Sequence, residues 1–127
     1  MVKSRSSMKN KLPQKTEKPW GFELLYALTP KYAGKIIFVK KGHRLSLQYH
    51  EKKDESIYIY EGKALVEIEE SDGHIASTIF QPGQCLRIPP SAKHRMKALE
   101  DTTFLEVSTP ELEDVTRLED DYGRARQ

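Results

Sequence analysis

Short stretches in which apolar and polar residues alternate follow one another along most of this chain. They include "KIIFVK", "RLSLQYH", "SIYIYEG", "KALVEIEE", "IASTIF", "CLRIP", "HRMKALE" and "TFLEVS". The stretches are rich in Ile, Val, Tyr, Phe and Thr, which pack well on a pleated sheet. Turn-forming pairs such as Lys-Gly, Glu-Gly and Pro-Gly separate several of them. Regularly spaced short strands of this kind predict an all-β sandwich or barrel.

The two ends of the chain do not follow this pattern. Residues 1–17 are polar and rich in lysine, with no apolar period, so we expect a disordered or loosely packed basic segment. One β domain should then occupy residues 18–127, since 127 residues suffice for a single domain with a real core. Its last part, residues 110–127, reads as a C-terminal arm that is either extended or contains one helical turn.

Alternation also predicts two different faces for residues 44–50. One face is apolar and carries Leu45, Leu47 and Tyr49. The other face is polar and carries Arg44, Ser46, Gln48 and His50. An ordinary strand with one solvated face explains this pattern, and so does a strand that presents ligands to a metal ion.

Glu55 and His94 favour the metal site. If residues 51–54 form a tight turn, Glu55 returns to the neighbourhood of His50 on a strand whose same face carries Ile57 and Ile59. A carboxylate beside isoleucines is costly unless it is paired or bound to a cation. His94 likewise shares an apolar face with Met96 and Ala98, although a hydrogen-bonded core histidine would show the same pattern.

Gln48, His50, Glu55 and His94 together offer two nitrogen and two oxygen ligands. Such a set suits one divalent ion, with Zn as the first expectation and Mn, Co, Ni or Fe as alternatives. Four protein ligands on a six-coordinate ion leave room for water and substrate, which a Lewis-acid site requires.

The spacing of these residues resembles the two motifs of the cupin superfamily. The first motif is matched at Gly42, Gln48, His50, Glu55 and Gly62, with Gln48 at a position where histidine is more usual. The second is matched at Gly83, Pro89 and His94, with Ser91 in place of the usual glycine and Ala98 in place of the usual asparagine. The resemblance implies a double-stranded β-helix, the jelly-roll barrel of cupins.

The chain is most similar to the cupin domain of type II mannose-6-phosphate isomerases, usually the C-terminal part of a bifunctional enzyme. The matching segments are "KPWGFE", "GHRLSLQYH", "IPPSAKHR" and "VTRLEDDYGR", and "EDDYGR" is typical of that group. The resemblance implies that Gln48, His50, Glu55 and His94 are the metal ligands. It also implies a homodimer that interconverts mannose 6-phosphate and fructose 6-phosphate or a related phosphosugar.

A departure from the family pattern keeps other functions open. Where the family has "HHHRAEHW", this chain has "HEKKDESI", which retains only His50 and Glu55 among the functional positions. The alternative function is therefore a non-catalytic, metal-holding cupin that binds a sugar or a nucleotide sugar. An iron-dependent oxygenase is disfavoured, because such sites use three histidines and Gln48 is a weaker donor to Fe(II).

Isomerisation of a phosphosugar also needs a cation for the phosphate and a group that moves a proton. Arg44 is the first candidate cation because it shares the ligand face, and Lys53 stands where the family has arginine. Arg124 in "EDDYGR" comes next, and Arg117 is a weaker candidate. For the proton, the sequence leaves open Glu51, Lys52, an acid of the arm or water activated by the ion.

Composition narrows the class of partner. Lys plus Arg number 21 against 19 Asp plus Glu, so the net charge of +2 gives no strong field for nucleic acid or membrane. The single cysteine cannot form an internal disulfide, and no apolar run approaches the roughly 20 residues that span a bilayer. The N-terminus also lacks the apolar segment of a secretory signal. We therefore expect a cytoplasmic protein without a nucleic-acid or membrane partner, and the family resemblance implies a small phosphosugar as its ligand.

Overall fold

The structure is a computed structural model that describes residues 12–125. Among these residues the elements are strands, and no helix could span a membrane. The strands are β1 (Gln14–Lys18), β2 (Gly21–Leu28), β3 (Ala33–Val39), β4 (Leu47–Tyr49), β5 (Glu55–Glu61), β6 (Ala64–Glu69), β7 (Ile75–Phe80), β8 (Cys85–Ile88), β9 (His94–Ala98), β10 (Thr102–Ser108) and β11 (Thr116–Glu119).

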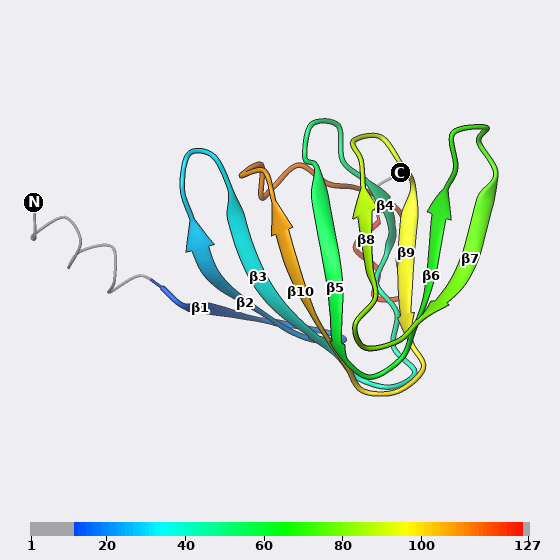
Figure 1. The fold of residues 1–127 in the computed structure, drawn as a ribbon, viewed down its shortest axis with the longest axis horizontal. Helices are drawn as coiled ribbons and strands as arrows, with labels where there is room; N and C mark the ends of the chain where they lie inside the picture. Colours follow the sequence, from blue (N-terminus) through cyan, green and yellow to red (C-terminus); the bar gives the residue numbers. More distant parts are fainter. Residues whose placement is uncertain (1–11, 126–127) are drawn as a thin grey trace, which may run out of the picture.

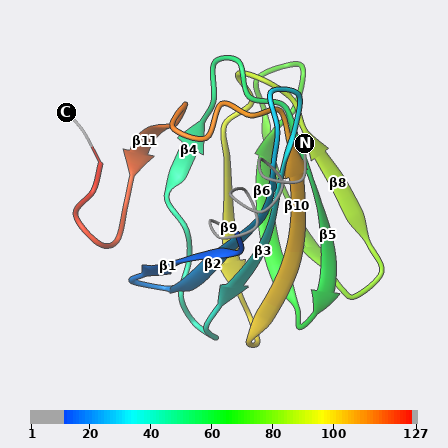
Figure 2. The same cartoon turned by 90° about the vertical axis from the view of Figure 1, so that its left-hand side faces the viewer.

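Two antiparallel sheets face each other (Figures 1 and 2). The six-stranded sheet has the order β1-β2-β3-β10-β5-β8, and the five-stranded sheet has the order β11-β4-β9-β6-β7. The chain crosses between the sheets several times, so strands that are neighbours in sequence often lie in different sheets. This arrangement confirms the predicted all-β fold of the jelly-roll type.

Alternating residues from both sheets form the core between them. Ile57 and Ile59 point inward from β5, and Met96 points inward from β9. Tyr58 and Tyr60, which alternate with the two isoleucines, remain exposed. The faces expected for residues 55–61 are therefore confirmed, and the polar residues on the inward face, including Glu55, lie at one end of the barrel.

The N-terminal boundary differs from the expected one. Gln14–Lys18 form β1, which pairs with β2 at the edge of the six-stranded sheet. The sheet thus begins before residue 18, while residues 1–11 of the expected basic segment lie outside the described residues. At the other end, the C-terminal arm is extended rather than helical, because Thr116–Glu119 form β11 against β4.

Gly62 shows why one glycine of the cupin-like spacing is needed. Its φ is +99°, and a Cβ atom at this position would lie 2.3 Å from the carbonyl oxygen of Asp101. Any other residue would have to displace the backbone that leads into β10. The tight turn between β5 and β6 therefore depends on a residue without a side chain.

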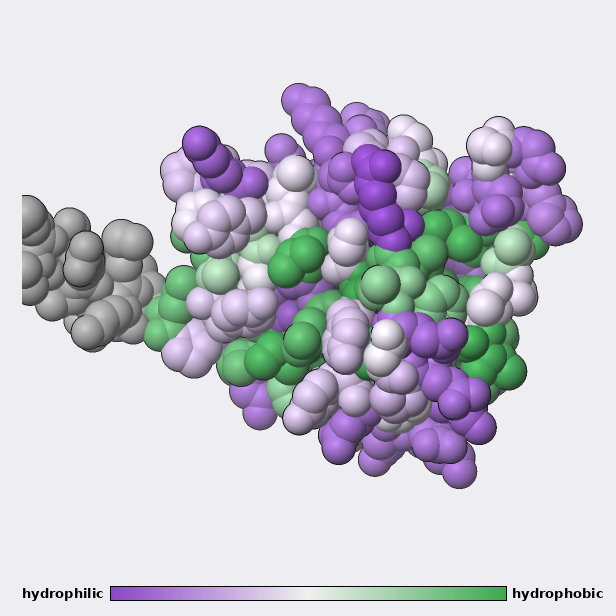
Figure 3. All heavy atoms as spheres, in the orientation of Figure 1, coloured by the Kyte–Doolittle hydropathy of each residue, from purple (hydrophilic) through white to green (hydrophobic). Residues whose placement is uncertain are grey.

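The outer surface of the six-stranded sheet has a banded appearance. Hydrophilic residues gather toward the two ends of the strands, and hydrophobic ones lie at the surface between them (Figure 3). Val107 on β10 is 55% exposed. The band lies outside the barrel, so it does not line the cluster of polar residues inside.

Candidate metal centre

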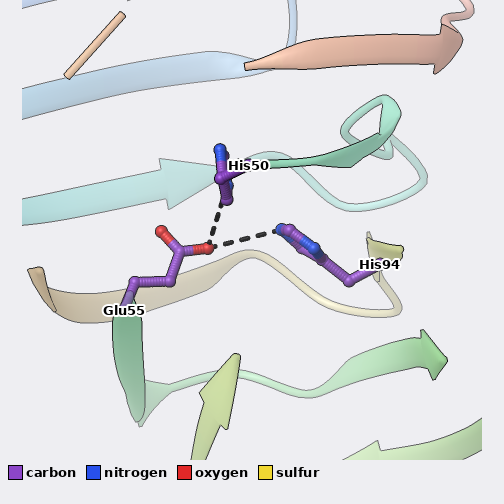
Figure 4. Close-up of side chains that lie close together, drawn as sticks. All are labelled: His50, Glu55 and His94. Carbon is purple, nitrogen blue, oxygen red and sulfur yellow. Dashed lines mark ion pairs between the residues drawn. The ribbon is translucent and has the colours of Figure 1, made fainter. Parts of the chain in front are cut away.

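His50, Glu55 and His94 meet inside the barrel (Figure 4). His50 follows the last residue of β4, whereas Glu55 and His94 are the first residues of β5 and β9. Glu55 Oε2 lies 3.4 Å from His50 Nε2 and 3.3 Å from His94 Nε2. The three side chains are buried, and their nearest donor atoms all lie within 4.8 Å of one another.

Backbone carbonyls fix the orientation of both imidazoles. His50 Nδ1 donates to the carbonyl oxygen of Asp114 at 2.6 Å, and His94 Nδ1 donates to that of Ala92 at 3.0 Å. Each ring therefore turns the lone pair of Nε2 toward Glu55. Metal-binding histidines are commonly held by such a bond from their other nitrogen.

The cluster meets the requirements of a divalent ion. Ligand atoms held about 2.0–2.2 Å from one ion lie roughly 3–4 Å apart, which agrees with the two distances to Glu55. His50 Nε2 is buried and has no hydrogen-bond partner among residues 12–125. Because unpaired buried polar atoms are rare, this atom indicates a missing ligand. The residues present therefore fit a metal ion, whose identity the geometry leaves open.

Gln48 lies beside this triad. It is the cross-strand partner of His94, and its Nε2 lies 3.4 Å from His94 Nε2. Its Oε1 accepts a hydrogen bond from the Ser46 hydroxyl at 2.8 Å. A half-turn of the amide would present Oε1 to the cluster and let Nε2 donate to Ser46. Gln48 is thus close enough for its predicted role as a fourth ligand, which stays a prediction.

Lys53 lies between two buried carboxylates. Its Nζ is 3.1 Å from Glu55 Oε1 and 3.1 Å from Glu106 Oε2. Burial alone would lower the pKa of Lys53, but Glu106 and Glu55 raise it well above its ordinary value. Lys53 was a predicted phosphate-binding residue, and the structure holds its ammonium group against the second oxygen of the metal-site carboxylate.

The pKa values of the two carboxyl groups move in opposite directions. Burial acts to raise the pKa of Glu55, but the neighbouring imidazoles of His50 and His94 and the positive charge of Lys53 outweigh it and hold that pKa well below its usual range. The pKa of Glu106 is raised to about 7, mainly by burial and then by the charge of Glu55. The carboxylate of the cluster is therefore ionised, as a metal ligand must be.

A pocket opens from the cluster. Its volume is about 260 Å³, and a smaller cavity of about 40 Å³ adjoins it near Gln48, Glu55 and His94. Five of the six buried polar side-chain atoms without a hydrogen-bond partner belong to residues that line the larger pocket. They are Trp20 Nε1, His50 Nε2, Glu55 Oε1, Glu106 Oε2 and Arg117 Nε. Glu55 Oε1 and Glu106 Oε2 are ion-paired with Lys53, whereas the other three atoms have no hydrogen-bond partner among residues 12–125. These three unpaired atoms indicate a ligand-binding pocket.

The other predicted cations occupy different places. Arg44 forms two hydrogen bonds with Asp121, at 2.7 and 2.9 Å, and does not line the pocket. Arg124 lines the pocket but is paired with Asp120. The candidate proton carriers Glu51 and Lys52 do not line it either, and their backbone amides donate to the Asp114 carboxylate.

Sequence reasoning missed Glu106 and Asp114. Alternation in "TFLEVS" already placed Glu106 on the inward face of β10 with Phe104, so its burial could have been predicted. For Asp114, the sequence contains no such signal. Its carbonyl reaches His50 only because the arm returns alongside β4.

Comparison with known proteins agrees with this geometry. Two antiparallel sheets around a buried His, Glu and His cluster define the cupin class, and this chain is a cupin. A family model described as "Mannose-6-phosphate isomerase C-terminal" matches residues 5–121, and the chain belongs to that family. A comparison with curated proteins finds no match.

Solved structures of several other cupins share the fold. Oxalate decarboxylase from Bacillus subtilis has a TM-score of 0.76 at 20% identity, covering 85% of this chain and 30% of that chain. KdgF from Halomonas sp. has a TM-score of 0.70 at 23% identity, and the match covers 80% of this chain and 89% of the KdgF chain. The capsular polysaccharide assembling protein CapF from Staphylococcus aureus has a TM-score of 0.69 at 18% identity. This match covers 84% of this chain and 34% of the CapF chain. These likenesses show the fold alone.

Proposed function

We propose that this protein is a metal-dependent isomerase that interconverts mannose 6-phosphate and fructose 6-phosphate. The observation that carries the proposal is the buried cluster opening into a pocket in which Trp20 Nε1 and Arg117 Nε have no hydrogen-bond partner among the described residues. The family membership supports the choice of substrate. The pocket volume of about 260 Å³ lies just below the range of about 300–1,000 Å³ typical of small-molecule sites, which suits a monosaccharide better than a nucleotide sugar.

The triad would hold the ion, with Gln48 as the proposed fourth ligand. When bound, a divalent ion supplies an electrophile that stabilises negative charge developing on the sugar oxygens. Metal binding by related folds supports this role, since Mn(II) centres are described for Bacillus subtilis oxalate decarboxylase. In this chain, Asp114 and Ala92 keep the two imidazoles oriented by accepting the Nδ1 protons.

Aldose–ketose isomerisation also needs a group that carries a proton between C1 and C2. Among the described residues, four glutamates line the pocket, and three of them already interact with other charged groups or belong to the cluster. Glu55 belongs to the cluster, while Glu106 and Glu23 are paired with Lys53 and Lys35. Glu113 in the C-terminal arm forms no ion pair within residues 12–125. We therefore assign proton transfer to the Glu113 carboxylate.

Sugar binding without turnover is the second candidate function. The placement of Lys53 favours it, because the cation that stands where the family has arginine is held between Glu55 and Glu106. A pocket in this state could still bind a sugar through its other polar groups. Activity measurements separate the two functions.

The decisive test is a coupled assay for fructose 6-phosphate formed from mannose 6-phosphate. Protein of known metal content would be assayed with Zn, Mn, Co and Ni added in turn. We expect turnover that the His94→Ala variant loses together with bound metal, because His94 Nε2 faces Glu55 in the cluster. His74→Ala is the matched control, since His74 is exposed in the turn between β6 and β7.

If metal is bound but no turnover appears with any ion, the isomerase proposal is wrong and sugar binding without turnover becomes the proposed function. Turnover by metal-free His94→Ala protein would overturn the metal-dependent mechanism.

A further inference from the structure

The pocket is lined by five cationic side chains, and four of them already have a carboxylate partner. Lys18 and Lys35 approach Glu23 at 4.0 and 2.9 Å. Lys53 lies between Glu55 and Glu106, and Arg124 is paired with Asp120 at 2.9 Å. The fifth cation is Arg117.

Arg117 forms no ion pair within the described part of the chain, and its Nε is buried without a hydrogen-bond partner. Burial lowers the pKa of Arg117, and the nearby positive charge of Arg124 lowers it further. The carboxylates of Asp120 and Glu23, each already paired with another cation, act in the opposite direction and offset this only in part. A partly buried guanidinium beside a second one is unfavourable unless an anion offsets the two charges. Within the described part of the chain, Arg117 therefore has no carboxylate of its own to pair with, and an anionic ligand group would complete its surroundings.

Strand register places Arg117 in line with the metal centre. Arg117 on β11 is the cross-strand partner of Gln48 on β4, and Gln48 is the partner of His94 on β9. Cross-strand partners carry their side chains on the same face of a sheet. With strands about 4.8 Å apart, Arg117 lies roughly 10 Å across the sheet from His94. A hexose 6-phosphate, which is longer than its six-carbon chain by the phosphate group, can bridge this interval, with C1 and C2 at the cluster and the phosphate at Arg117.

We propose that Arg117 binds the phosphate group of the sugar phosphate, at the end of the pocket away from the metal centre. This inference rests on the proposed function, which it deepens by naming the residue that selects a phosphorylated sugar. The planar guanidinium can donate two parallel hydrogen bonds to phosphate oxygens. Trp20 Nε1, the other unpaired donor in the pocket, is available to a further oxygen of the ligand.

Binding can be measured without relying on turnover. Trp20 is the only tryptophan of the chain and lines the pocket, so its fluorescence should report a bound ligand. The metal-loaded full chain would be titrated with mannose 6-phosphate, mannose, mannuronate and inorganic phosphate, with calorimetry as a second readout. Arg117→Gln and Arg117→Lys would be compared with wild type.

Arg87→Gln provides the matched control, because it removes the same charge from a surface pair with Asp54. For Arg117→Gln we expect affinity for mannose 6-phosphate to fall at least about tenfold, the loss typical of a charge-assisted hydrogen bond. Affinity for mannose should stay unchanged, and Arg117→Lys should recover part of the loss. Thermal unfolding and metal content would show that the variants remain folded and loaded.

The outcomes separate this inference from the proposed function. If mannose 6-phosphate binds in an Arg117-dependent way but is not turned over, the isomerase proposal is overturned and the proposed phosphate site is supported. Turnover with an unchanged KM in Arg117→Gln would retain the isomerase and overturn the phosphate site. Equal affinity of wild type and Arg117→Gln for mannose 6-phosphate, no binding by wild type, or Arg117-dependent binding of mannuronate alone would also overturn it.

Discussion

Lys53 carries a positive charge into the interior of the barrel, where it is only 5% exposed. The sequence suggested that this lysine contacts substrate, because it replaces an arginine of the family pattern. In the structure its ammonium group instead joins Glu55 to Glu106. Glu106 comes close only through the pairing of β10 with β5, which residue spacing alone does not reveal.

Replacing Lys53 with methionine should be strongly destabilising. Removal of one partner of a buried ion pair typically costs about 3–5 kcal/mol, because the remaining charges are left uncompensated. Denaturant unfolding of metal-free protein would measure the change. Lys97→Met, on the exposed side of β9, should change the free energy of unfolding little.

A second substitution tests the cause of that loss. Adding Glu106→Gln to Lys53→Met should recover part of the lost stability, because a neutral amide then replaces one of the two carboxylates that have lost Lys53 as a partner. If the two changes simply add, the interaction between Lys53 and Glu106 does not explain the effect.

The three residues of the cluster could be predicted because local signals coincide at each of them. The same signals indicate Gln48 as a fourth ligand, which stays a prediction. Gln48 and His50 lie on the polar face of an alternating stretch, and Glu55 and His94 interrupt apolar faces. The lack of an ion pair at Arg117 could not be predicted, because it depends on which carboxylates form ion pairs with the other cations of the pocket. Sequence reasoning accordingly ranked Arg44 above Arg117, whereas the structure pairs Arg44 with Asp121 outside the pocket.

At the scale of elements, the C-terminal arm is the part that sequence reasoning described least well. From the sequence, the arm could have been extended or could have contained a helical turn. In the structure it is extended, because residues 116–119 pair with β4 as strand β11. Side-chain contacts hold the arm to the barrel, between Arg44 and Asp121, His43 and Tyr122, and Arg95 and Glu119. Much of the "EDDYGR" stretch therefore serves to attach the arm.

Asp114 links the arm to the metal centre. Its carboxylate accepts backbone hydrogen bonds from residues 51, 52 and 53, and its carbonyl accepts the Nδ1 proton of His50. We expect Asp114→Ala to reduce stability by about 1–2 kcal/mol, as the loss of a capping side chain does. Metal affinity should fall about tenfold or more, because the turn that carries His50 to Glu55 is loosened.

Metal titration and thermal unfolding of Asp114→Ala would check both effects. Asp72→Ala is a suitable comparison, since Asp72 accepts one backbone hydrogen bond from His74 in a turn away from the site. A loss of stability with unchanged metal affinity would show that the turn does not position the ligands.

For the whole molecule, the fold class was predictable while the strand order was not. Period-two alternation and turn residues identify short strands from local sequence, and nearly all of the expected strands appear in the structure. The pairing of β10 with both β3 and β5 joins segments far apart in the chain. Such pairing follows from long-range packing, which local pattern does not specify.

Because the cluster takes ligands from β5, β9 and the end of β4, a bound ion should stabilise both sheets together. Removing the metal with a chelator should lower the melting temperature, and free metal at 100 times its dissociation constant should contribute about 2.7 kcal/mol. His50→Ala protein should have a melting temperature that is insensitive to both chelator and metal. An equal response of wild type and His50→Ala would place the stabilising ion elsewhere.

The position of the arm in the chain has a consequence for biosynthesis. Translation proceeds from the N-terminus, so His50, Glu55 and His94 are all joined before residues 112–124, which include part of the pocket wall. His50 therefore acquires its carbonyl partner, Asp114, only after the arm has been made and has docked on β4. A ribosome-bound chain that stops before residue 114 would contain the three side chains of the cluster but not the acceptor that orients His50.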